Sequence, residues 1–180
     1  QSALHAACQL GAQQLLPVVC LPDVQAATAW GFARIGPHRR AWLANTIQNL
    51  LQGLSSKRSQ LLILNQPAAT ALPALARAVG ASTLVCEDIA APEEQATVAA
   101  LRAVCEVHAV WQSTLYAPEA LPMPPHQVPD TFTAFRRQLE ASGATEATPL
   151  PAITAWPKVP GHDFIHPTLA AAQAPLAARS

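Results

Sequence analysis

The run Leu15-Leu16-Pro17-Val18-Val19-Cys20-Leu21 decides how this chain folds, because it is apolar along its whole length. A short apolar run without alternation suits a strand that is buried on both faces. Three more strand-like runs follow, and helical patterns over 37–54, 68–79 and 92–104 separate the strands, which we place at 15–21, 60–64, 82–86 and 107–111. Strands that alternate with helices predict an α/β fold with a doubly wound parallel sheet.

The two ends of the chain depart from this alternation. Residues 2–10 form a short amphipathic pattern that ends at Gly11, so the chain opens on a helix and we expect a strand to precede it. After residue 110 come a proline-rich loop and one helix over 131–141, which Asp130 is expected to cap. We therefore divide the chain into an α/β domain, 1–143, and an extended arm rich in Pro and Ala, 144–180.

Composition narrows the classes of function. The chain has 180 residues, 51% of them hydrophobic and only 12% charged, with a formal net charge of zero. Zero net charge argues against nucleic-acid binding by this chain alone. No apolar run approaches the roughly 20 residues that a membrane helix needs. The first residue is Gln1 and the single methionine is Met123, so we expect translation to start upstream.

Two blocks carry a resemblance to a known family. The first is Gly31-Phe32-Ala33-Arg34-Ile35-Gly36-Pro37-His38-Arg39-Arg40-Ala41-Trp42-Leu43. The second runs through Thr114-Leu115-Tyr116, Leu121-Pro122 and Pro129-Asp130-Thr131-Phe132-Thr133-Ala134-Phe135-Arg136. Both blocks, in this order, resemble the cryptochrome-DASH branch of the DNA photolyase family over residues 1–151.

The resemblance implies the antenna-binding α/β domain of that family without its first strand and without its flavin domain. The first strand of the family lies between those at 15–21 and 82–86, so we expect these two in one sheet. The domain can hold a folate (methenyltetrahydrofolate) or a deazaflavin. The acidic residue for folate would be Glu93, with Glu87, Asp88 and Glu94 as the other candidates. No FAD is expected in this chain.

Other residues are also candidates for binding or structural roles. Arg34, Arg39 and Arg40 crowd one loop-to-helix junction and would suit an anion or an acidic partner, although a solvated face is the commoner explanation. His162 and His166 lack helical context, so no metal site is predicted. The four cysteines lie far apart and are interpreted as buried free thiols. The tryptophans Trp30, Trp42 and Trp111 are interpreted as packing residues.

The arm carries three large apolar side chains without helical or strand periodicity, namely Trp156, Phe164 and Ile165. We expect them to anchor the arm on a protein partner.

Two functions remain open from the sequence. One is a non-catalytic binding or assembly subunit that kept the fold and lost the flavin domain. The other is the antenna-binding front part of a blue-light flavoprotein for DNA photorepair or light sensing. The chain alone is not expected to repair DNA. The expected location is a reducing compartment, either a chloroplast or other organelle or a bacterial cytoplasm.

Overall fold

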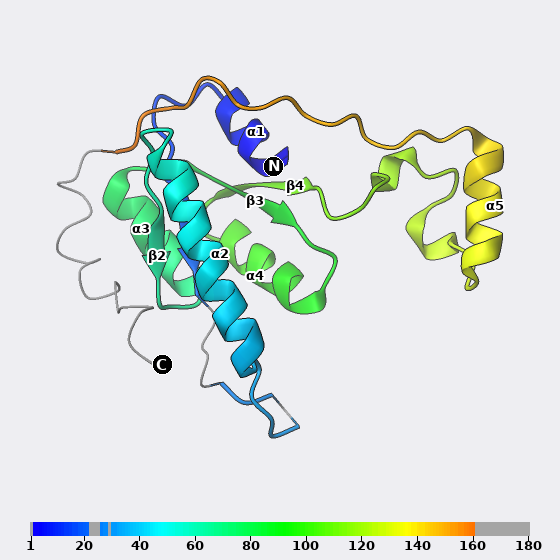
Figure 1. The fold of residues 1–180 in the computed structure, drawn as a ribbon, viewed down its shortest axis with the longest axis horizontal. Coiled ribbons are helices and arrows are strands. Elements are labelled where there is room, and N and C mark those ends of the chain that lie inside the picture. Colours follow the sequence, from blue (N-terminus) through cyan, green and yellow to red (C-terminus); the bar gives the residue numbers. More distant parts are fainter. Residues whose placement is uncertain (1, 22–25, 29, 161–180) are drawn as a thin grey trace.

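The computed structural model describes residues 2–21, 26–28 and 30–160 (Figure 1). Its helices and strands follow the alternation predicted from the sequence. In chain order they are α1 (Ser2–Gln9), β1 (Val18–Cys20), α2 (Pro37–Ser55), β2 (Leu62–Leu64), α3 (Ala68–Val79), β3 (Thr83–Asp88), α4 (Pro92–Arg102), β4 (Glu106–Trp111), the short helices η1 (Pro118–Ala120) and η2 (Pro125–Gln127), and α5 (Phe132–Ser142).

Both sheets in the described part of the chain have parallel strands, as predicted. β1 pairs with β2 through Val18↔Leu62, and β3 pairs with β4 through Thr83↔Glu106. The expectation that 15–21 and 82–86 share one sheet is wrong for the described residues, because β1–β2 and β3–β4 are separate two-stranded sheets. The strand expected between them is not among these residues.

The sheet of β1 and β2 has a helix on each face. Val18 and Cys20 pack with α3 residues, whereas Val19 and Leu21 pack with the α2 residues Ile47 and Leu54. Successive strand residues point to opposite faces, so each face receives half of the strand's side chains. α2 and α3 therefore cover opposite faces of β1–β2.

The sheet of β3 and β4 is covered in the same way. α1 contacts both strands, and α4 contacts β4. Figure 1 shows α1 above this sheet and α4 below it. Because α3 and α4 also contact each other, they form one continuous helical layer beneath both strand pairs.

The chain after β4 leaves this body. It passes through η1 and η2 to α5, the yellow helix at the far right of Figure 1, and the segment after α5 runs back to the body. The cap predicted for this helix is wrong: Thr131 is the N-cap residue and no side chain caps it. Gly143 ends the helix in the left-handed conformation, as predicted for a glycine stop.

Candidate functional site

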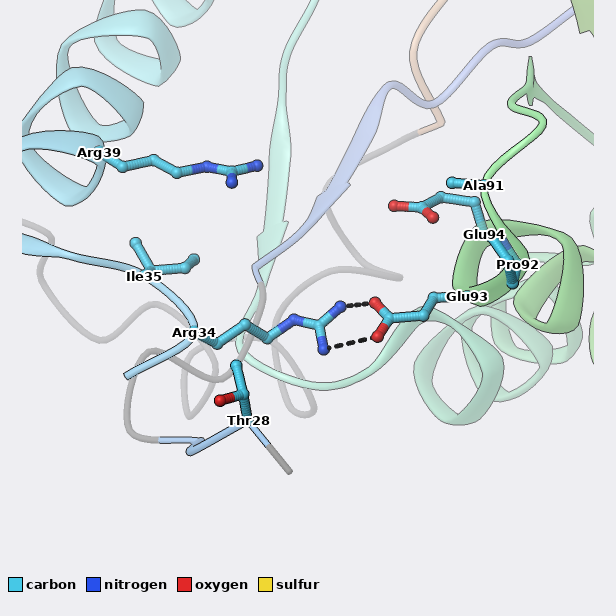
Figure 2. Close-up of a pocket in the computed structure, with 8 residues that line it drawn as sticks. All are labelled: Thr28, Arg34, Ile35, Arg39, Ala91, Pro92, Glu93 and Glu94. Carbon is cyan, nitrogen blue, oxygen red and sulfur yellow. Dashed lines mark hydrogen bonds and ion pairs between the residues drawn. The ribbon is translucent and has the colours of Figure 1, made fainter. Parts of the chain in front are cut away.

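An open pocket of about 730 Å³ lies where the segments that follow β1 and β3 face each other. Figure 2 shows the residues that line it, which are Thr28, Arg34, Ile35, Arg39, Ala91, Pro92, Glu93 and Glu94. The carboxyl ends of parallel strands are the usual ligand-binding edge of an open α/β sheet. The pocket is therefore the best candidate site in the described part of the chain.

One wall of the pocket is a tight hairpin. Its two sides meet at an isolated antiparallel bridge between Ala27 and Ala33, and the Arg34 amide donates to the carbonyl of Ala26 at 3.1 Å. Gly31 lies at the turn with φ +81°, a conformation that side-chain-bearing residues rarely adopt. The hairpin fixes the backbone from which Arg34 extends into the pocket.

Arg34 and Glu93 form an ion pair across the mouth of the pocket. The Arg34 Nη1 donates to Glu93 Oε1 at 3.0 Å, and Nη2 lies against Oε2. The sequence predicted Arg34 as an anion or partner contact and Glu93 as a folate contact. The structure brings the two together, and each satisfies the other's charge.

Two further charges face the same space. Arg39 extends from the first turn of α2, and Glu94 from the first turn of α4 (Figure 2). The pocket thus presents one cation and one carboxylate besides the Arg34–Glu93 pair. Arg40, predicted as part of the same arginine cluster, does not line the pocket.

The other predicted folate contacts lie elsewhere. Glu87 accepts a hydrogen bond from the Ser113 hydroxyl at 2.5 Å, and Asp88 accepts one from Gln95 Nε2 at 2.7 Å. Both carboxylates therefore serve contacts within the chain. Thr28 and Ile35, which do line the pocket, carry no signal in the sequence that would have identified them.

Several large apolar side chains lie on the surface. Trp30 and Phe32, 81% and 59% exposed, stack at the hairpin tip with ring centroids 6.1 Å apart. Trp42 on α2 is 65% exposed. The interpretation of Trp30 and Trp42 as packing residues is wrong in this structure, because both side chains are mostly exposed.

The arm was predicted to anchor on a partner through Trp156, Phe164 and Ile165. Trp156 instead packs against Ile47, Leu54 and Leu61 of the chain's own body. Lys158 pairs with the segment before β1, where the Leu15 amide donates to its carbonyl at 2.8 Å. Phe164 and Ile165 lie outside the described residues.

The described residues contain neither a candidate metal site nor a candidate membrane-spanning helix. They contain no cluster of three potential metal ligands and no helix long and apolar enough to cross a membrane. All four cysteines are free and half-buried. Burial raises the pKa of the Cys8, Cys20 and Cys86 thiols, so these side chains are poor nucleophiles at neutral pH.

Comparison with known proteins points to the same family as the two sequence blocks and the fold. The DNA photolyase family profile matches residues 1–156. A cryptochrome DASH of Natronomonas pharaonis is 29% identical over 153 residues, and a chloroplastic/mitochondrial cryptochrome DASH of Arabidopsis thaliana is 27% identical over 163 residues. The crystal structure of a Synechocystis cryptochrome superimposes with a TM-score of 0.75 at 28% identity, covering 91% of this chain.

The fold and the profile together define the class as an α/β unit of a photolyase or cryptochrome. The chain belongs to the DNA photolyase family. The chain spans about a third of the length of these relatives. The alignment covers 78% of this chain and 32% of the Natronomonas protein, and it covers 81% of this chain and 29% of the Arabidopsis protein. The structural match covers 37% of the Synechocystis chain.

Proposed function

We propose that this chain is the α/β docking portion of a photolyase-like flavoprotein, and that the flavin is carried by the body it docks against. The observation that carries this proposal is where the exposed apolar side chains lie. Phe32 and Trp42 fall in the first block that resembles the family, and Leu115 and Phe132 fall in the second. Each of the two blocks that make the chain resemble a photolyase therefore presents large apolar side chains at the surface.

Such exposure needs a partner surface. Exposed large apolar side chains gathered in particular segments mark sites where another surface docks. Aromatic side chains also dominate the binding free energy of many protein interfaces. Burying one of them contributes about 2–3 kcal/mol. The exposed apolar side chains therefore support a docking role for this chain. A free-standing subunit would have no use for such a surface.

The test is to purify the chain in its native assembly and to replace Phe32 and Trp42 by serine. We expect the double variant to lose the flavin-bearing body while its melting temperature stays unchanged, because both side chains lie outside the core. Val104→Ser is the matched control, since Val104 is 60% exposed but lies outside both blocks. A double variant that keeps its flavin would contradict the proposal.

A second role, antenna binding, is favoured by the pocket. Its volume of about 730 Å³ lies within the roughly 300–1,000 Å³ of small-molecule sites. A carboxylate suits the adjacent N–H donors of a pterin, and a guanidinium suits the carboxylates of a glutamate tail. Glu93 or Glu94 would hold the pterin, and Arg34 or Arg39 the tail. A bound folate would supply light absorption.

Titration with methenyltetrahydrofolate tests this role. We expect Glu93→Gln and Arg39→Met each to weaken binding at least about tenfold, because each removes a charge-assisted hydrogen bond. Glu119→Gln is the control, since it removes an exposed carboxylate of η1 outside the pocket. Equal folate affinity in all four proteins would argue against an antenna at this site.

A further inference from the structure

A second pocket, of about 390 Å³, lies at the other end of α2 from the first. One side is the turn that follows α2, with Ser56, Lys57 and Arg58, and the other side is the arm, with Thr154, Trp156 and Lys158. Figure 1 shows the arm, in orange, passing this end of the helix. α2 has 19 residues, so at 1.5 Å per residue it separates the two pockets by about 28 Å. The second pocket is therefore distinct from the proposed antenna site.

Three cations line this pocket, and no carboxylate does. Lys57 and Lys158 are the only lysines in the sequence, and they reach the same pocket as Arg58 from segments far apart in the chain. Within the described residues, none of the three pairs with a carboxylate. Like charges around one space repel each other. The pocket is therefore a concentration of positive charge in a chain whose formal net charge is zero.

The end of α2 explains only part of this charge. A helix C-terminus carries partial negative charge, so cations such as Lys57 and Arg58 are favoured beside it. Lys158 comes from the arm, where its amide donates to the Gln13 carbonyl at 3.2 Å and its carbonyl accepts from the Leu15 amide. This backbone pairing does not need a lysine. The side chain of Lys158 therefore adds a positive charge that neither the helix nor the pairing of the arm requires.

Arg58 has an unusual backbone conformation at the same place. Its φ of +56° is the only positive φ of a non-glycine residue in the part of the chain that the structure describes. Glycine is the usual residue in such a turn after a helix. Side-chain-bearing residues held in this conformation are concentrated at functional sites. The arginine thus gives the pocket a guanidinium at a position where a glycine would suit the backbone better.

We infer that this pocket binds the phosphate chain of a polyphosphate-bearing ligand. Lysine and arginine supply the charge-assisted hydrogen bonds that phosphate oxygens accept. The hydroxyl of Thr154 is a further donor in the same lining. The volume of about 390 Å³ lies within the roughly 300–1,000 Å³ of small-molecule sites, and it exceeds what one phosphate fills. The inference goes beyond the docking and antenna proposals and depends on neither.

The arm also gives the pocket an apolar side, formed by Trp156 and Pro157. The indole N–H of Trp156 donates to the Ile153 carbonyl at 3.2 Å, so the ring offers a ligand its apolar surface only. A base attached to the phosphate chain would contact this side, whereas a free polyphosphate would leave it bare. The phosphate chemistry is thus common to a nucleoside triphosphate and a free polyphosphate.

The test is isothermal titration calorimetry of the whole chain with sodium tripolyphosphate, ATP and orthophosphate, at fixed salt and without Mg²⁺. We expect tripolyphosphate to bind at least about tenfold more tightly than orthophosphate, because a phosphate chain reaches all three cations. Replacing both lysines, Lys57→Met with Lys158→Met, should weaken tripolyphosphate binding at least about tenfold. The matched control is Arg77→Met with Arg137→Met. It also removes two exposed cations, but they lie outside the pocket and are screened by salt, so the affinity should change less than about twofold.

Hydrogen exchange locates the bound anion. Tripolyphosphate should slow exchange of the Leu15 and Lys158 amides at least about threefold, because the ligand joins the arm to the end of α2. The lysine double variant should lose this effect. Without ligand it should keep the melting temperature of the parent chain, because both lysine side chains are exposed.

Equal weakening by the lysine pair and the arginine pair would overturn the site, because the anion would then respond only to overall charge. Tripolyphosphate that binds no more tightly than orthophosphate would overturn it as well. Tighter binding of ATP than of tripolyphosphate would support a nucleotide as the source of the phosphate chain, and equal binding would support a free polyphosphate. A hexaglutamate peptide that binds more tightly than both would make an acidic polypeptide the occupant and overturn the phosphate assignment.

Discussion

At the residue scale, the ion pair of Arg34 and Glu93 is the feature that most changes how the site is understood. The sequence identified both residues as binding candidates, but they are 59 positions apart and nothing in the sequence couples them. Their meeting depends on the relative placement of the hairpin and α4, which is a tertiary property. Glu87 and Asp88 were chosen on equal grounds, and contacts with Ser113 and Gln95 occupy them instead.

Glu93→Gln should lower the free energy of unfolding by less than about 1 kcal/mol, because exposed ion pairs contribute little. The side chains of Arg34 and Glu93 are 45% and 63% exposed. Urea unfolding of Glu93→Gln, Arg34→Met and the double variant gives the coupling free energy. A coupling above about 2 kcal/mol would show that the pair is screened from solvent far more than this structure indicates.

Raising the pH should destabilise the chain through Cys20. Burial raises the pKa of this thiol above the ordinary value of 9.0, so the folded state favours the neutral form. Its contribution to stability is complete below the unfolded pKa and is lost as the pH rises through the folded pKa. Urea unfolding below the unfolded pKa and above the folded pKa measures this effect. The free energy of unfolding should fall less with pH in Cys20→Ser than in the parent chain, because serine does not ionise in this range. An equal loss in both proteins would argue against a buried Cys20.

At the element scale, helices were predicted more closely than strands. The helix 68–79 was predicted with its exact bounds, because Gly80 adopts the left-handed conformation that ends it. The strand at 15–21 shortens to β1, because residues 14 and 15 pair with the arm at Lys158 rather than with β2. Pairing of that kind with a segment far along the chain leaves no trace in local apolar patterns.

α2 allows a comparison of two apolar residues on one helix. Ile47 is 2% exposed, whereas Leu50 is 43% exposed and lies outside the core. Ile47→Ala should cost about 2–5 kcal/mol of unfolding free energy, and Leu50→Ala less than about 1 kcal/mol. Chemical denaturation of the two variants measures the difference. Similar costs at both positions would mean that α2 faces the sheet with a different side.

Trp156→Ala should lower the stability of the body by about 2 kcal/mol, because its half-buried ring packs against Ile47, Leu54 and Leu61. For a chain of this size, that corresponds to a fall in melting temperature of about 4–8 °C. Leu150→Ala, at an exposed position of the same arm, is the control. An unchanged melting temperature would restore the expectation that Trp156 serves a partner rather than the chain itself.

At the scale of the whole molecule, the chain has the fold of its family and much of its apolar surface uncovered. The α/β class followed from the strand–helix alternation and the family from two blocks of residues. The division at residue 143 stays a prediction. The gap between β1 and β3 lies where the resemblance places the family's first strand, whereas local apolar patterns alone do not reveal it.

We propose that this chain docks against a flavin-bearing body, and the absorbance spectrum of its natively purified assembly tests that proposal most directly. We predict the blue absorption band of a flavin in the fraction that contains this chain. Serine at Phe32 and Trp42 should remove that band, while Val104→Ser should keep it. A native assembly that contains the chain and is colourless would contradict the account, and would favour a binding subunit that has lost the flavin altogether.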